Sequence, residues 1–215
     1  MAVMAKICGL NAPDAVAAAV AGGAGHIGLV FYPPSPRCVT PGRAALLAAE
    51  VPRAVGKVGL FVDAADDTLA AALDEVDLDL LQLHGDESVD RVAAVRARFG
   101  VPVMKAICVS CESDVAAADA YAEVADWLLF DARALAERPG ALPGGNALAF
   151  DWRLLAGRRW DVPWMLSGGL DADNVAEAVG VAGARAVDVS SGVEDRRGHK
   201  SAGKIAAFLA AVRRL

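Results

Sequence analysis

Lys6-Ile7-Cys8-Gly9-Leu10 contains the end of the first of eight short apolar runs in this chain. The runs recur roughly every 25 residues, with amphipathic stretches between them, which is the spacing of strand–helix units. They are almost continuously apolar, as strands of a parallel sheet covered by helices are. The predicted strands are Met4-Cys8, His26-Phe31, Lys57-Val62, Leu78-Leu83, Val103-Cys108, Trp127-Asp131, Trp164-Ser167 and Ala186-Ser190.

The segments between these strands carry apolar residues at helical spacing. The clearest sets are Leu69, Leu73 and Val76; Val92, Val95 and Phe99; Val175, Ala178 and Val179; and Ile205, Phe208, Leu209 and Val212. Thr40 followed by Pro41 predicts a helix start, and Asp63 and Asp171 are further predicted cap residues. The sixth helix has the least room, between Asp151 and Gly157.

Eight such units occupy nearly all of the 215 residues, and no Pro/Gly/Ser-rich linker divides them. The sequence therefore predicts an α/β fold, a (β/α)₈ TIM barrel that forms a single domain over residues 1–215. A doubly wound open sheet is the rival. It normally has fewer strands, and no GxGxxG fingerprint follows the first strand.

Composition limits the partners. A formal net charge of −6 and a pI near 5.1 argue against nucleic acid and anionic membranes. The hydrophobic content of 55% is largely alanine, and no run of about 18 strongly apolar residues or secretory leader is visible. We expect a cytoplasmic protein. The four cysteines are scattered, which argues against a disulfide framework.

Chemically capable residues stand at the predicted carboxyl ends of the strands, where barrels carry out chemistry. Cys8 ends the first strand and Asp131 the sixth. A thiol with a lowered pKa serves as a general base, and a carboxyl group with a raised pKa as a general acid. This pair suggests proton transfer without redox chemistry, although a buried small hydrophobe and a helix cap remain the simpler interpretations.

Two glycine-containing loops follow the last two strands. Ser167-Gly168-Gly169 and Ser190-Ser191-Gly192 lie where barrels commonly bind phosphate. Glycine lets backbone N–H groups approach phosphate oxygens, and a helix N-terminus would add favourable polarity. Ordinary turn glycines are the alternative, but a pair in the last two units favours phosphate.

Longer motifs then resemble one family. They are Lys6-Ile7-Cys8-Gly9-Leu10, Gly28-Leu29-Val30-Phe31, Ser35-Pro36-Arg37, Leu81-Gln82-Leu83-His84-Gly85-Asp86-Glu87, Phe130-Asp131, Phe150-Asp151-Trp152, Leu166-Ser167-Gly168-Gly169-Leu170 and Asp188-Val189-Ser190-Ser191-Gly192-Val193-Glu194. In this order, along the whole chain, they resemble phosphoribosylanthranilate isomerase of tryptophan biosynthesis.

The resemblance implies a TIM barrel that rearranges N-(5-phosphoribosyl)anthranilate without cofactor or metal. It implies Cys8 as general base and Asp131 as general acid. Arg37 is expected to meet the carboxylate or ring of the anthranilate group. The protein would be a monomer or a homodimer, a state that the sequence does not decide.

Three further residues are candidates around the substrate. His84 could touch substrate or bond the backbone at the rim. Asp188 could position groups near the acid or serve the fold. Lys6 lies two residues before Cys8 on the same predicted face and could favour its thiolate.

The sequence departs from the family pattern in two places. Gly144-Gly145-Asn146-Ala147 stands where the family usually has Gly-Gly-Ser/Thr-Gly. Gly144 and Gly145 keep their expected role in phosphate binding, but we expect weaker substrate affinity. The second departure is Cys108-Val109-Ser110-Cys111, a CxxC that is only half of a zinc site.

Two other functions stay open at this point. A related phosphosugar barrel resembling aminoimidazole ribotide isomerase, or a bifunctional version, would usually have an aspartate where Cys8 stands. A catalytically silent phosphate-binding protein is the other, and the presence of both Cys8 and Asp131 argues against it.

Overall fold

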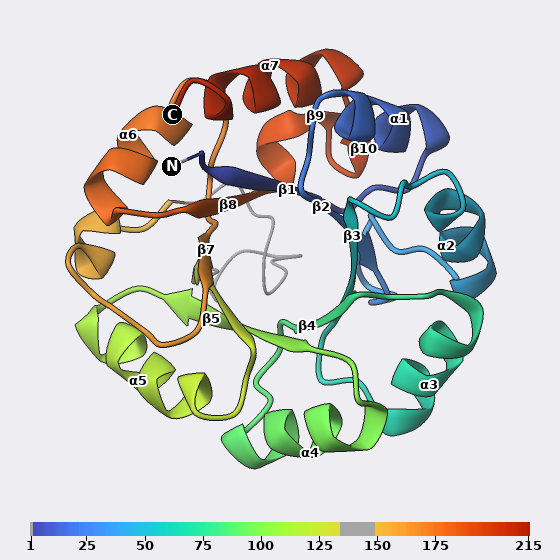
Figure 1. The fold of residues 1–215 in the computed structure, drawn as a ribbon, viewed down its shortest axis with the longest axis horizontal. Coiled ribbons are helices and arrows are strands. Elements are labelled where there is room, and N and C mark those ends of the chain that lie inside the picture. The colour runs from blue at the N-terminus through green and yellow to red at the C-terminus, as the bar shows by residue number, and fades with distance from the viewer. Residues whose placement is uncertain (1, 134–148) are drawn as a thin grey trace.

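The strands form a closed, parallel barrel in chain order (Figure 1). This is a computed structural model, and it describes residues 2–133 and 149–215. The strands are β1 (Met4–Cys8), β2 (His26–Val30), β3 (Gly56–Phe61), β4 (Leu80–Leu83), β5 (Val103–Val109), β6 (Trp127–Ala132), β7 (Trp164–Leu166) and β8 (Ala186–Val189). The predicted TIM barrel is confirmed, and the predicted strands all form, with small differences at their ends.

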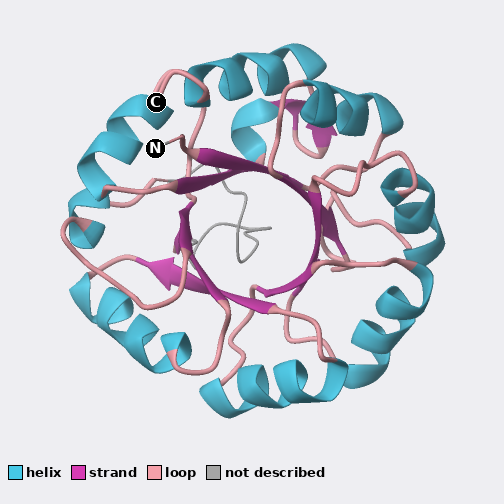
Figure 2. Cartoon of the chain, viewed as in Figure 1, coloured by secondary structure: helices cyan, strands magenta, loops and turns pink. Residues whose placement is uncertain are grey.

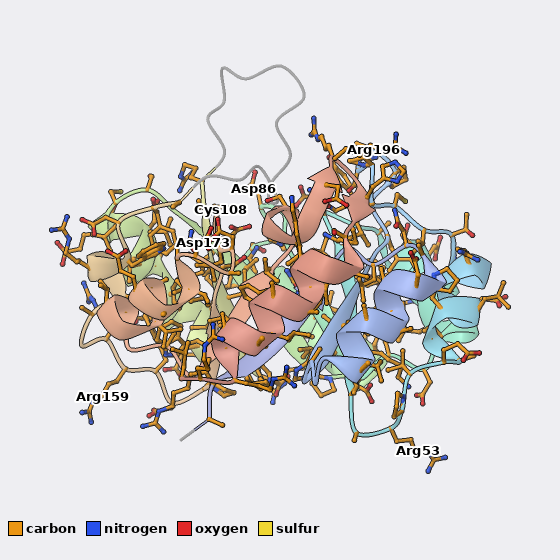
Figure 3. The ribbon with its side chains drawn as sticks, turned by 90° about the horizontal axis from the view of Figure 1, so that it is seen from above. Arg53, Asp86, Cys108, Arg159, Asp173 and Arg196 are labelled. Carbon is orange, nitrogen blue, oxygen red and sulfur yellow. The ribbon has the colours of Figure 1, made fainter. Side chains whose placement is uncertain are left out.

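Parallel pairing through the whole barrel collects the strand ends on two opposite rims. β1 pairs with β2 and with β8, where Lys6 stands opposite Asp188, so the sheet has no free edge. Figure 3 shows Asp86, which follows β4, and Cys108, near the carboxyl end of β5, along one edge of the molecule. Arg53 and Arg159, which precede β3 and β7, lie along the opposite edge. Chemistry at the first rim can therefore evolve apart from packing at the second.

Helices surround the barrel as an outer ring (Figure 2). They are α1 (Pro13–Ala21), α2 (Pro41–Ala48), α3 (Asp66–Glu75), α4 (Val89–Phe99), α5 (Glu112–Ala122), α6 (Val175–Ala182) and α7 (Ala202–Val212). The predicted sixth helix is wrong between Asp151 and Gly157, where only a short 3₁₀ helix, Trp152–Leu155, forms. A second 3₁₀ helix, Ser191–Val193, follows β8 and leads into a small hairpin of β9 (Glu194–Arg196) and β10 (His199–Lys200).

Two of the three predicted helix caps form. The Thr40 hydroxyl accepts a hydrogen bond from the Arg43 N–H, and Pro41 opens α2. Asp171 caps the turn that opens α6: its carbonyl accepts from the Val175 N–H at 3.2 Å, and its own N–H donates to the Asn174 side chain at 2.9 Å. Its carboxylate accepts from the Asp173 and Asn174 N–H groups, as the side chain of a cap residue does.

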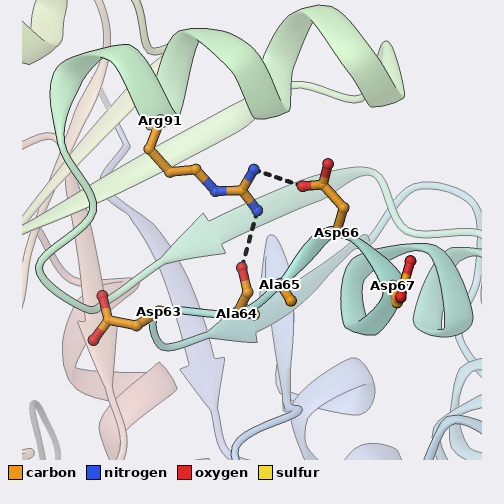
Figure 4. A pocket seen from close by; sticks show the side chains of 6 residues that line it. All are labelled: Asp63, Ala64, Ala65, Asp66, Asp67 and Arg91. Carbon is orange, nitrogen blue, oxygen red and sulfur yellow. Dashed lines mark hydrogen bonds and ion pairs between the residues drawn. The ribbon is translucent and has the colours of Figure 1, made fainter.

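Asp63 is not a cap of α3. Its φ of +46° turns the chain, and its carboxylate accepts from the Asp86 N–H in the loop after β4. The start of α3 is instead fastened by Arg91 of α4, which binds Asp66 at 2.5 Å and donates to the Ala64 carbonyl at 2.9 Å (Figure 4). The shallow depression there is thus lined by side chains already engaged in holding two helices together.

The apolar core has two parts because strand residues alternate in direction. Outward residues such as Ile7, Leu81 and Phe130 pack against the helices in the larger cluster. A smaller cluster fills the inside of the barrel and consists of Val58, Leu80, Met104, Ala106, Leu129, Met165 and Ala186. This layer closes the barrel below the polar residues of the rim, so the structure is a packed core with a site on top.

Over the ranges 2–133 and 149–215, the chain contains no helix with the length and apolarity needed to cross a membrane.

Candidate active site

Cys8 is a buried thiol at the end of β1, with 4% of its surface exposed. Burial raises the pKa of its thiol, while the Lys6 and Lys200 ammonium groups act in the opposite direction and limit that rise. Gly28 stands beside it on β2, where an added Cβ would lie 2.8 Å from the Cys8 Sγ. The neighbouring strand therefore leaves room for the sulfur only because it carries glycine there.

Lys6 lies below Cys8 on the same inward face of β1 and is completely buried. Its Nζ donates to Asp188 of β8 at 2.8 Å, and Asp188 accepts a second hydrogen bond from the Ser167 hydroxyl at 3.3 Å. Burial alone would lower the pKa of Lys6, but the charges of Asp188 and Cys8 raise it. Lys6 is thus held as a cation next to the thiol. Asp188 is connected to Lys6, on the side of the predicted base.

Asp131, at the end of β6, is also buried, with 5% exposed. One carboxylate oxygen accepts from the Ala132 N–H at 2.8 Å, and the other lies 3.3 Å from Nε2 of His84. His84 therefore meets the predicted acid with one ring nitrogen and the Gln82 side chain with the other, at 2.8 Å. The sequence led us to expect that His84 touches substrate or bonds the backbone, and its contact with Asp131 was not predicted.

Arg37 reaches the rim from the loop after β2 and is 3% exposed. Its Nε and Nη2 donate to the two oxygens of Glu194 at 2.6 and 2.9 Å, a bidentate pair that fixes the plane of the guanidinium. The arginine stem passes over Gly9, where an added Cβ would lie 2.6 Å from Cδ. Arg37 is therefore placed beside Gly9, the residue that follows β1.

Glu194 and Lys200 were missed as site residues. Lys200 is buried at its side chain and donates to Glu194 at 2.9 Å and to the Ser190 carbonyl at 2.8 Å. Burial lowers the pKa of Lys200, whereas the bonds from Arg37 and Lys200 overcome burial and lower the pKa of Glu194. Glu194 is the last residue of the family motif that starts at Asp188, so the sequence could have indicated it. Lys200 depends on the β9–β10 hairpin, which no local pattern predicted.

The loops after β7 and β8 meet at the rim. Gly168 and Gly169 have φ of +90° and +64°, which favour glycine, and an added Cβ on Gly192 would collide with the Leu170 carbonyl. The two predicted phosphate loops, with Ser190 and Ser191 at the start of the second, are therefore in contact. The expected helix N-terminus is further away: α6 starts only at Val175, and the Asn174 side chain ties the turn back to the Gly169 carbonyl at 2.8 Å.

Gly144, Gly145 and the departure Asn146-Ala147 lie outside the described residues. Of the CxxC, Cys108 is partly buried and burial raises the pKa of its thiol to about 11. Cys111 is exposed, and hydrogen bonding with Ser113 lowers the pKa of its thiol. Among the described residues, no three His, Cys, Asp or Glu side chains gather closely enough to hold a metal ion.

A thiol and a carboxyl group at one rim of a barrel, with an imidazole against the carboxyl group and paired glycine loops beside them, define a TIM-barrel enzyme of the acid–base class. Residues 5–211 match the family model described as N-(5'phosphoribosyl)anthranilate (PRA) isomerase. The chain belongs to this family, as the motifs predicted.

Relatives and solved structures agree over almost the full chain. The N-(5'-phosphoribosyl)anthranilate isomerase of Rhodospirillum centenum is 60% identical over 98% of both chains. That of Parvibaculum lavamentivorans is 50% identical over 100% of both. The crystal structure of phosphoribosyl anthranilate isomerase from Thermotoga maritima superposes with a TM-score of 0.86 at 35% identity, covering 99% of this chain and 100% of that one.

Proposed function

We propose that this chain converts N-(5-phosphoribosyl)anthranilate into 1-(2-carboxyphenylamino)-1-deoxyribulose 5-phosphate, an Amadori rearrangement in tryptophan biosynthesis. The observation that carries the proposal is the placement of Cys8 and Asp131, both buried and both at the carboxyl rim of the barrel, in a member of this family. A 33% identical phosphoribosyl anthranilate isomerase has been solved in complex with reduced 1-(o-carboxyphenylamino)-1-deoxyribulose 5-phosphate, which supports the same ligand class here.

Asp131 acts first, as the general acid. It gives its proton to the ring oxygen of the ribose, the bond between that oxygen and C1′ breaks, and the anilino nitrogen supplies the electron pair that makes the open-chain iminium. The Ala132 N–H, 2.8 Å from one carboxylate oxygen, stabilises the negative charge that Asp131 then carries.

Cys8 acts second, as the general base. Its thiolate removes the proton from C2′, and the electrons of that C–H bond neutralise the iminium to give an enolamine. Tautomerisation of the enolamine gives the ketone. One proton leaves Asp131 and one arrives at Cys8, so the step is an isomerisation without net redox change.

Lys6 keeps this base usable in our proposal. A buried thiol holds its proton more tightly than a free one, and a cation beside it favours the thiolate. Lys6 and Lys200 act on the pKa of Cys8 in this direction. Asp188 keeps Lys6 charged and in place, so Lys6 and Asp188 serve the base even where they do not touch substrate.

The ends of the substrate are assigned to the two sides of the rim. The Arg37 guanidinium, fixed by Glu194, receives the anthranilate group. The phosphate lies against Gly168 and Gly169 after β7 and against Ser190, Ser191 and Gly192 after β8, with Gly144 and Gly145 contributing from the preceding unit. His84 acts on Asp131 and stays a predicted substrate contact as well.

We infer a cytoplasmic enzyme that acts on a small phosphosugar and binds neither nucleic acid nor membrane, in line with its net charge of −6. A dimeric relative from Thermotoga maritima has also been obtained as a monomer, so both states are proposed for this chain.

The test is an absorbance or fluorescence assay of phosphoribosylanthranilate turnover by the purified chain and by Cys8→Ala and Asp131→Asn. Loss of either proton transfer should lower kcat roughly a hundredfold or more. An inert wild type would overturn the proposed activity, and full activity in both variants would overturn the residue roles. Turnover of an aminoimidazole ribotide substrate in a parallel assay would reveal a bifunctional enzyme.

A further inference from the structure

Gln82 is a buried polar residue that the reaction described above does not use. It lies on the inward face of β4, between Leu80 of the inner core and His84 of the rim, and its side chain is fully buried. Burying an amide without partners is costly, so a buried glutamine needs a reason. Within the described residues, its Nε2 contacts Nδ1 of His84 at 2.8 Å, and its Oε1 has no partner.

This contact decides where the histidine proton lies. The Nε2 of an amide is a donor only, so the atom that it contacts must offer a lone pair. Nδ1 of His84 therefore carries no proton, and the neutral ring carries its proton on Nε2. That nitrogen is the one that faces Asp131, 3.3 Å from its Oδ2.

The outer nitrogen of His84 has no other partner among the described residues, and its contact with Asp131 is electrostatic rather than a well-aligned hydrogen bond. Such contacts at catalytic sites often shorten once substrate is bound. With the proton on Nε2, shortening makes His84 a donor to the carboxylate. The carboxylate then has a donor on each oxygen, because Oδ1 already accepts from the Ala132 N–H at 2.8 Å.

We propose that Gln82 is a positioning residue that holds His84 in the Nε2–H tautomer, so that His84 orients Asp131 and stabilises the carboxylate left after proton donation. This inference rests on the proposed role of Asp131 as the acid. Gln82 acts through His84 and does not touch substrate, since it lies one layer further into the barrel.

Nitrogen-15 NMR of the imidazole rings tests the tautomer without substrate. The chain has three histidines, so a His84→Gln spectrum assigns the signal of His84 by difference. We expect the protonated nitrogen of wild-type His84 to be Nε2. Gln82→Glu places an acceptor against Nδ1 and should reverse the tautomer, and Gln82→Met should remove the preference with nearly the same side-chain volume. A wild-type His84 protonated at Nδ1 would overturn the proposal.

Kinetics of the same variants test the consequence. Gln82→Glu and Gln82→Met should lower kcat about tenfold, less than the loss of the acid itself, and leave KM nearly unchanged. Leu81→Met on the outward face of the same strand is the control for strand damage, since volume-conserving core swaps are mild. A correct tautomer with unchanged kcat in both variants would refute the role of Gln82 in the reaction. If wild type is inactive, the proposed function fails, yet the tautomer result still stands or falls by itself.

Discussion

Two buried lysine–carboxylate pairs of the same length differ in the face of the barrel on which the lysine lies. Lys6 and Asp188 join at 2.8 Å, and Lys105 and Glu87 also join at 2.8 Å, all four with side chains 5% exposed or less. Lys6 shares the inward face of β1 with Cys8. Lys105 shares the outward face of β5 with Ile107 and Val109, which pack against the helices. Whether each lysine points into or out of the barrel therefore decides whether its charge serves a reacting group or the fold.

The contacts of the outward pair are all structural. Lys105 also donates to the Gly85 carbonyl at 2.6 Å, and Glu87 accepts from the N–H groups of Asp63 and Gly85. The Tyr121 hydroxyl of α5 donates to the Glu87 carbonyl at 2.9 Å. This pair ties β5 and α5 to the loops after β3 and β4. Within the described part of the chain, the inward pair has no such connections to helices, and it acts on the pKa of Cys8.

Lys6→Met is expected to give the largest difference between the two pairs. Removing the cation lets burial raise the pKa of Cys8 further, so the thiolate fraction falls and the activity shifts to higher pH. We expect kcat at pH 7 to fall roughly a hundredfold. The check is kcat against pH, together with direct titration of Cys8 by its rate of alkylation.

The double variant Lys6→Met with Asp188→Leu separates charge from folding, because it leaves no unpaired carboxylate in the barrel. Hydrophobic replacement of a whole buried pair is often neutral or stabilising. The double variant should therefore fold well and stay slow. An unchanged pKa of Cys8 in Lys6→Met would remove Lys6 from the mechanism.

Lys105→Met should show the reverse pattern. It leaves Glu87 as a buried charge without its cation, which costs about 3–5 kcal/mol of unfolding free energy. The reacting groups stay in place, so kcat of the folded fraction should stay near the wild-type value. Urea unfolding and kcat measured on the same samples check this. A loss of kcat equal to that of Lys6→Met would abolish the contrast between the two faces.

The sequence predicted the link between Lys6 and Cys8, but neither of the two lysine–carboxylate pairs. Lys6 and Cys8 are two residues apart in a strand, so their common face follows from strand geometry alone. The barrel itself followed in the same way from eight apolar runs, because each run is local. Lys105 and Glu87 lie in different units, as Lys6 and Asp188 do, and nothing local indicates that either pair meets. Lys200 was missed for the same reason, and the sixth helix was predicted from a segment too short for one.

Gly168→Ala tests the part of the barrel rim that contacts Asp131. Its φ of +90° strains any other residue, and the new Cβ would lie 2.8 Å from the Ala132 N and 3.3 Å from Oδ1 of Asp131. We expect a stability loss of about 1–3 kcal/mol from the backbone, and in addition kcat about tenfold lower because the carboxyl group is displaced. Steady-state kinetics and urea unfolding check both effects.

Gly183→Ala is the matched control for that change. Gly183 has a φ of +72° at the end of α6, and an added Cβ there meets nothing within 4 Å. It carries the same kind of backbone strain without a collision, so stability should fall and kcat should not. Equal losses of kcat in both variants would show that the rim responds to general destabilisation.

The smallest expected effect is on the pH dependence of stability and involves Cys108. This residue lies on the inward face of β5 and pairs with Asp131 in the strand register. Burial, followed by the charge of Asp131, raises the pKa of its thiol from 9.0 to about 11. Because of this raised pKa, the unfolded chain loses the Cys108 proton at a lower pH than the folded chain does. The folded state therefore keeps its full stability below pH 9 and loses part of it as the pH rises toward 11. Cys108→Ala should therefore lose less stability than wild type on going from pH 8 to pH 10, by about 1 kcal/mol.

Cys111 is exposed and its thiol pKa is lowered, so Cys111→Ala should lack this advantage. If unfolding of Cys108→Ala and wild type responds equally to pH, then the inward face at β5 admits enough water to solvate the thiolate.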